Sequence, residues 1–171
     1  MLVPDTSSHV VISGIGNDIT PVHMYDDDYT NMFAYDYSEE GVNRARELFG
    51  TDRDVELITA DATNLPLDKA SVDATLDKGT LDAIFITGKE IFKESVKEMT
   101  RYTAPEGRVV SISRVIDSDV LLEAFDNQFW ENINDGTLAF ATDGEATIDL
   151  GAELYSWKRT DVPFKQSTIP S

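Results

Sequence analysis

The chain has 171 residues, enough for one domain with a single core, and its formal net charge is −18. It has no cysteine, two histidines and no apolar run long enough for a membrane helix, which argues against disulfides, thiol nucleophiles, metal sites and membrane insertion. Acidity without a basic stripe argues against nucleic-acid binding and fits a solvated surface or a cationic partner. Residues 1–9 are polar and too short for a signal peptide, so we expect a cytoplasmic protein.

The first part of the chain predicts strands alternating with one well-marked helix. Short apolar runs between turn residues are typical of buried strands. We expect these strands at residues 9–13, 31–36 and 55–59. Between the last two, Ser38 predicts a helix cap, residues 40–49 carry apolar positions at helical spacing, and Gly50 predicts the stop.

The alternation continues through the middle of the chain. Its apolar runs, helical periodicity and turn residues predict two more strands and further helices. In order, we expect a strand at 72–76, a turn or helix opening at 80–84, an amphipathic helix at 89–103, a tight turn at 105–107, a strand at 108–113 and a helix at 118–125.

The C-terminal part predicts antiparallel strands. Residues 137–142 and 145–150 flank Asp143-Gly144, a strong two-residue hairpin signal, and 153–158 predicts one more strand. Trp130 and Trp157 are expected to pack these strands. We therefore expect a single α/β domain over residues 1–171, with a doubly wound, mostly parallel seven-stranded sheet and an antiparallel C-terminal hairpin edge.

Glycines follow the first predicted strand, where such sheets bind ligands beyond the carboxyl ends of their strands. In the string SGIGND, Gly14 and Gly16 would let the backbone turn tightly and approach a ligand closely. A plain strand-to-helix turn is the alternative.

Acids end the next three strands. Asp36 lies twenty residues after Gly16, the spacing at which an acid accepts hydrogen bonds from ribose hydroxyls. Asp61 ends the third strand, where an acid or a backbone amide can reach an adenine amino group, and Asp77 ends the fourth. The structural alternatives are a solvated loop acid and, at Asp77, a helix cap.

Residues just after the glycines discriminate between two cofactor classes. A nicotinamide dinucleotide needs a third glycine where Ile19 stands, and Asp18 would set a negative charge beside its phosphates. A cofactor with a positive sulfonium and no phosphates tolerates Asp18, so S-adenosylmethionine is favoured over NAD.

Over residues 10–158 the chain resembles class I S-adenosylmethionine-dependent methyltransferases. The resemblance lies in a glycine motif, an acidic motif, an adenine-contact motif and a proline-glycine turn, at residues 11–17, 34–38, 59–62 and 104–109. Residues 77–83 (DKGTLDA) are similar to the signature of a eukaryotic branch related to elongation-factor lysine methyltransferases.

The resemblance implies a Rossmann-like fold, S-adenosylmethionine as cofactor and S-adenosylhomocysteine as product. The cofactor-binding residues are then expected to be Gly14, Ile15, Gly16, Asn17, Asp36, Tyr37, Asp61, Ala62, Asp77 and Lys78. The catalytic residues are expected to be Asp77, Asp18 and Tyr37. For Tyr37, an aromatic wall around the methyl group or the adenine is weighed against a packing role.

The chain also departs from the family pattern. Ile12 replaces the usual acid of the first strand, and only thirteen residues precede Gly14, where family members carry lid helices. We expect the lid to be missing, or to come from residues 1–8, from residues 19–30 or from a second chain in a homodimer.

We expect in-line methyl transfer, with most of the acceleration coming from positioning of the two reactants. A small nucleophile such as a halide or thiol is slightly favoured as acceptor, since an anion needs no base. The alternative is a lysine of an elongation factor or another basic protein, which must first lose a proton, and Asp18, Asp77 and Asp82 could line a pocket for it. A catalytically silent, cofactor-binding regulator is the alternative of a different class.

Overall fold

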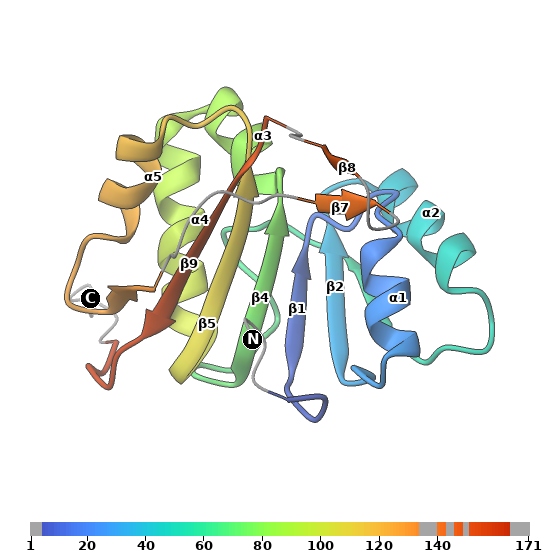
Figure 1. The fold of residues 1–171 in the computed structure, drawn as a ribbon. Helices are drawn as coiled ribbons and strands as arrows, with labels where there is room; N and C mark the ends of the chain where they lie inside the picture. The colour runs from blue at the N-terminus through green and yellow to red at the C-terminus, as the bar shows by residue number, and fades with distance from the viewer. Residues whose placement is uncertain (1–4, 134–139, 143–145, 149–150, 165–171) are drawn as a thin grey trace.

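The computed structural model describes residues 5–133, 140–142, 146–148 and 151–164 and contains a seven-stranded sheet (Figure 1). The strand order is β3-β2-β1-β4-β5-β9-β6. The strands are β1 (Val10–Ser13), β2 (Met32–Asp36), β3 (Glu56–Thr59), β4 (Val72–Lys78), β5 (Thr103–Ser113), β6 (Trp130–Asn132) and β9 (Glu153–Arg159). The first five strands run parallel, whereas β9 pairs antiparallel with β5 and β6 antiparallel with β9. The predicted fold class is confirmed.

Helices pack on both faces of this sheet, which explains why β1 and β2 are buried at every residue. The helices are α1 (Thr20–Asp26), α2 (Glu39–Phe49), α3 (Thr80–Thr87), α4 (Lys89–Tyr102) and α5 (Ser118–Phe125). Alternate residues of β1 enter different cores: Val10 and Ile12 pack in one cluster with α2, and Val11 packs in the other with α4 and α5. No helix in the described part of the chain is long and apolar enough to cross a membrane.

The antiparallel edge is built differently from the prediction. β7 (Phe140–Thr142) and β8 (Ala146–Ile148) pair with each other as a separate two-stranded sheet, and the predicted turn between them lies outside the described residues. The edge of the main sheet is formed instead by β9 and β6. β6 has three residues, too few to give a strand pattern, and it is fixed by pairing with β9 and by burial of Trp130. Trp157 is also buried, so the predicted packing role of both tryptophans is confirmed.

Local signals account for several element boundaries. Ser38 is the N-cap of α2, where its side chain accepts a hydrogen bond from the Gly41 amide, and Gly50 follows the last residue of that helix. The predicted turn at 105–107 is instead an irregularity within β5, with Glu106 at φ 66° and a register shift opposite β4. Helix α1 was not predicted, because its seven residues are too few for a clear helical pattern, although Pro21 stands in the first turn, where proline is favoured.

The strand register brings the candidate site together. Ser13 at the end of β1 stands beside Tyr35 of β2 on one side and Asp77 of β4 on the other. In Figure 1 the arrowheads of β1, β2 and β4 point to the same edge of the sheet. The glycine loop, the acid of β2 and the DKGTLDA segment therefore share this edge.

Candidate active site

A cavity of about 860 Å³ opens at the carboxyl ends of β1, β2 and β4. Its wall includes six residues predicted for the site: Gly14, Asp36, Tyr37, Asp61, Ala62 and Lys78. It also includes residues that were not predicted: Tyr35, Thr59, Ala60, Gly79, Thr80, Ala83, Ile84, Thr87 and Ile91. The place of the cavity agrees with the rule for ligand sites in doubly wound sheets.

The glycine loop begins with a backbone turn that glycine favours. Gly14 and Gly16 have φ of 59° and 46°. The Oγ1 of Thr80 donates a hydrogen bond to the Ser13 carbonyl oxygen at 2.7 Å, and a Cβ on Gly14 would lie 2.1 Å from that Oγ1. The first glycine is therefore required by contact with the DKGTLDA segment. Among the other predicted loop residues, Ile15 is buried, Asn17 is exposed, and neither lies on the cavity wall.

Asp36 is held at the cavity by backbone and hydroxyl donors. Its Oδ2 accepts from the Gly16 amide at 3.1 Å, and its Oδ1 accepts from the Ser38 amide and hydroxyl at 2.9 and 2.8 Å. The carboxylate also lies at the N-terminus of α2, where the helix dipole favours negative charge. The Gly16 amide thus helps to hold the Asp36 carboxylate in place. Because Oδ2 has one protein donor, it keeps capacity to accept from a ribose hydroxyl.

Asp61 forms a compact turn on the cavity wall, just beyond the end of β3. Its Oδ1 accepts from the Thr63 amide at 2.8 Å and from the Thr63 hydroxyl at 2.7 Å. These two hydrogen bonds lower the pKa of Asp61 below its ordinary value. The carboxylate therefore stays ionised at neutral pH, and Ala62 follows it on the cavity wall.

Asp77 is not among the residues of the cavity wall, and its expected role in catalysis and cofactor contact stays a prediction. The residue is 0% exposed, and its carboxylate accepts from the Ser111 hydroxyl at 2.5 Å and from the Leu81 amide at 3.0 Å. Burial raises its pKa to about 6. Gly79 is the N-cap residue of α3, and the Asp77 carboxylate, two residues before it, accepts from an amide in the first turn of that helix, as in the structural alternative of a capping acid.

Asp18 is engaged by Lys78 and is also absent from the cavity wall. The Lys78 ammonium lies 2.9 Å from Asp18 Oδ1, which also accepts from the Thr20 amide and hydroxyl. Burial opposes ionisation of Asp18, but the hydrogen bond from Lys78 and those from Thr20 lower its pKa overall. Asp18 thus pairs with Lys78, a residue of the cavity wall, and its expected catalytic role stays a prediction.

The remaining candidates divide between the cavity mouth and the protein interior. Tyr37 lies on the cavity wall and is 86% exposed, so it does not pack in the core. Asp82 is buried and accepts from the Ser113 hydroxyl and the amides of Arg114 and Ile116. Asp82 is therefore unavailable to an acceptor in the cavity. Within the described ranges no three His, Asp or Glu side chains are grouped so as to hold a metal ion.

The cavity fits S-adenosylmethionine chemically. Asp36 and Asp61 offer carboxylate oxygens at the ends of adjacent strands, as hydroxyl and amino donors require. Gly79, with φ 78°, lies on the wall, and a Cβ there would meet nothing within 4 Å, so the cavity is open beside it. The wall residues that were not predicted include several from α3 and α4, whose place at the cavity depends on how these helices pack. The DKGTLDA string pointed to Gly79, Thr80 and Ala83, but Ile84, Thr87 and Ile91 carried no such signal.

The sequence is similar to those of known methyltransferases. A family model described as a methyltransferase domain matches residues 12–111. The mouse eEF1A lysine and N-terminal methyltransferase is 30% identical over 104 residues, which are 60% of this chain but 14% of the mouse protein. The chain therefore spans a small part of that relative.

Two solved structures share the fold. An S-adenosylmethionine-dependent methyltransferase from Methanosarcina mazei has a TM-score of 0.74 at 11% identity, with 92% of this chain and 95% of that chain covered. The N-methyltransferase NodS from Bradyrhizobium japonicum, in complex with S-adenosylhomocysteine, has a TM-score of 0.67 at 10% identity, with 91% and 79% covered. At these identities the likeness is one of fold.

Proposed function

We propose that this chain, which belongs to the methyltransferase-domain family and has the fold of S-adenosylmethionine-dependent methyltransferases, methylates a small anionic nucleophile such as a thiolate or a halide. The observation that carries the choice of acceptor is Lys78. Lys78 lies on the cavity wall, and its half-exposed ammonium, which is bonded to Asp18, would be the cationic group that attracts an anion and repels a protonated lysine there.

The placement of the acids supports the same choice. A lysine side chain, with a reference pKa of about 10.4, must lose a proton before it can attack. The three acids expected to help it lie away from the cavity wall: Asp77 and Asp82 are buried, and Asp18 is paired with Lys78. The acids on the wall, Asp36 and Asp61, are tied to loop backbone and suit the cofactor's ribose and adenine.

Methyl transfer to an anion requires little from the protein beyond the positioning of the two reactants. S-adenosylmethionine, when bound, supplies a methyl group on a positively charged sulfur. Lys78 would hold the anionic acceptor at the cavity, while Asp36 and Asp61 would hold the adenosine part. The acceptor's electron pair forms the new bond to carbon as the carbon–sulfur bond breaks, so no proton has to move. Orientation of the reactants is then the main source of acceleration.

The test is transfer of the methyl group to a thiol or to iodide, with the elongation-factor substrate assayed in parallel. Lys78→Gln should lower kcat/KM for the anionic acceptor about tenfold, because a charge interaction with the acceptor is lost. Lys93→Gln, a matched change on the exposed face of α4, should leave kcat/KM unchanged. Methylation of a lysine without any transfer to thiol or iodide would reject the proposal.

A protein acceptor is the second candidate, and one feature of the cavity mouth favours it. Tyr37 and Ile91 of the cavity wall are 86% and 46% exposed, and such groups suit contact with a polypeptide. The names of the relatives and the similarity at residues 77–83 point to a lysine of an elongation factor. Activity on either acceptor class would exclude a silent, cofactor-binding regulator.

A further inference from the structure

The connection between β3 and β4 crosses the sheet without a helix. Residues 60–71 lead from the edge strand to the far side of β1, and the structure assigns no helix to them. Leu65 is buried in this connection, and Leu67 packs against the same core cluster. A buried loop must satisfy its backbone polar groups with partners from elsewhere in the protein.

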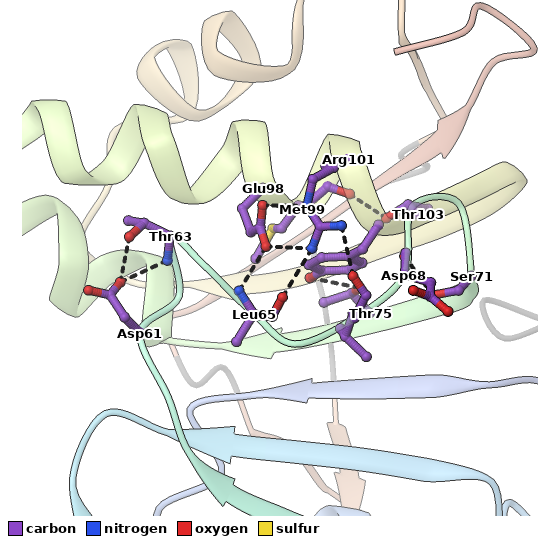
Figure 2. Close-up of polar contacts among 12 residues, drawn as sticks. Asp61, Thr63, Leu65, Asp68, Ser71, Thr75, Glu98, Met99, Arg101 and Thr103 are labelled. Atoms are coloured by element: carbon purple, nitrogen blue, oxygen red, sulfur yellow. Dashed lines mark hydrogen bonds and ion pairs between the residues drawn. The ribbon is translucent and has the colours of Figure 1, made fainter. Parts of the chain in front are cut away.

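Two charged residues of α4 supply those partners. Glu98 Oε1 accepts from the Leu65 amide at 2.8 Å, while Arg101 donates to the carbonyl oxygens of Leu67 at 2.8 Å and Leu65 at 3.2 Å. The two side chains also bind each other through two contacts of 2.7 Å and are 8% and 15% exposed. Figure 2 shows both reaching from the helix to the loop.

A short hydrogen-bonded turn connects this pair to the cavity. The Asn64 amide donates to the Asp61 carbonyl oxygen at 3.0 Å, and the Thr63 amide and hydroxyl donate to the Asp61 carboxylate. Asp61 and Ala62 lie on the cavity wall, within a few residues of the fixed Leu65 amide. In Figure 2 Asp61 and Thr63 lie on the same loop that Glu98 and Arg101 hold at Leu65.

We propose that Glu98 and Arg101 are positioning residues for the cofactor site, because they fix the loop that carries Asp61 and Ala62 at the cavity wall. Stability alone gives a weak reason for such a pair, since apolar residues of similar size often replace a buried ion pair without loss. Apolar residues could not hold one amide and two carbonyl groups in place. This inference rests on the proposed binding of S-adenosylmethionine at the cavity and not on which acceptor is methylated.

The test uses the full chain with S-adenosylhomocysteine as the probe. Glu98→Gln keeps the size of the side chain but removes its charge and replaces Oε2 by an amino group, which cannot accept from Arg101 Nε. Calorimetry should show the dissociation constant rising about tenfold, because a charge-assisted hydrogen bond that fixes the loop is lost. Hydrogen exchange should accelerate at the amides of residues 61–65 ahead of the sheet, and bound S-adenosylhomocysteine should restore their protection.

A matched control separates positioning from stability. Trp130→Phe removes the hydrogen bond from Trp130 Nε1 to Thr100 on the same helix and should lower the melting temperature without changing affinity. If Glu98→Gln lowers the melting temperature but leaves affinity unchanged, the pair is purely structural and the proposal is wrong. If Glu98→Gln does not fold, Arg101→Lys serves instead, since it keeps the charge but loses the bonds to Leu65 and Leu67. Unchanged affinity in that variant would equally overturn the proposal.

Discussion

The carboxyl group of Asp36 occupies the space that a side chain on Gly41 would need. A Cβ built at Gly41 would lie 2.5 Å from Asp36 Cγ and 2.7 Å from each of its oxygens. Gly41 lies in the first turn of α2, and every residue type except proline is a better helix former than glycine. The helix therefore gives up some stability so that the acid can fit against its N-terminus.

Gly41→Ala should push the Asp36 carboxylate away from Gly16 and Ser38. The expected result is weaker binding of S-adenosylhomocysteine by roughly 1–3 kcal/mol, the cost of leaving a polar partner unpaired. Calorimetry measures the change, and Asn43→Ala on the exposed face of the same helix is the control. Equal affinity in the two variants would show that Asp36 does not depend on Gly41.

Asp36→Ala tests the acid directly. It should weaken cofactor binding by roughly 1–3 kcal/mol if a ribose hydroxyl loses its acceptor. The same titration with NAD should show no binding to either form, because Asp18 and Ile19 do not suit a dinucleotide. An affinity for S-adenosylhomocysteine that survives the substitution would remove Asp36 from the site.

Gly14→Ala and Thr80→Ala should be strongly coupled. The first places a Cβ 2.1 Å from Thr80 Oγ1 and strains a backbone at φ 59°, and the second removes that hydroxyl. We expect the double variant to be more stable than the sum of the single effects predicts, by roughly 1 kcal/mol. Urea unfolding of the four proteins completes the cycle. Additive effects would mean that the two residues do not contact each other.

Burial of Asp77 predicts a particular pH dependence of stability. Its folded-state pKa is about 6, above the ordinary 3.8, so the folded state binds its proton more tightly than the unfolded state. Its stabilising contribution is therefore complete below pH 3.8 and is lost as the pH rises through 6. Relative to Asp77→Asn, the protein should lose roughly 2–3 kcal/mol between pH 4 and pH 7. Urea unfolding across this range checks the difference, and a constant difference would contradict the burial of an ionisable carboxyl.

The net charge of −18 predicts how the melting temperature of the protein changes with salt concentration. With a charge of −18, repulsion among surface carboxylates opposes folding, and salt screens it. The melting temperature should rise when KCl increases from about 0.1 M to about 1 M, where the screening length falls from about 10 Å to about 3 Å. A melting temperature that falls over this range would show that attractive ion pairs outweigh the repulsion.

Local signals in the sequence were enough to predict the parallel part of the fold. The Ser38 cap, the Gly50 stop and the apolar runs each act within a few residues, and the structure confirms the elements they predicted. The antiparallel edge was not predictable in detail. Whether β6 or the pair β7–β8 joins the sheet depends on packing against β9, which no local pattern encodes.

The same distinction applies to the site. Gly14 directly follows β1 and Asp36 is the last residue of β2, so their place at the cavity could be predicted from strand ends. Asp77 also lies near the end of a strand, β4, yet its carboxylate is buried and bonded to Ser111, a residue 34 positions away. Exposure of a carboxyl group is thus a tertiary property, and a motif can predict its position without predicting whether a ligand can reach it.

The register of β1 between β2 and β4 has a consequence for how the protein folds. The segments at the ends of β1, β2 and β4 are separated by about twenty and forty residues in sequence and meet only when these parallel strands pair. Such non-local pairing forms late and slowly, so a partly folded chain would have no cavity with which to bind the cofactor. Ligand binding should therefore select the complete sheet, and S-adenosylhomocysteine should slow global unfolding as well as protect the loops that contact it.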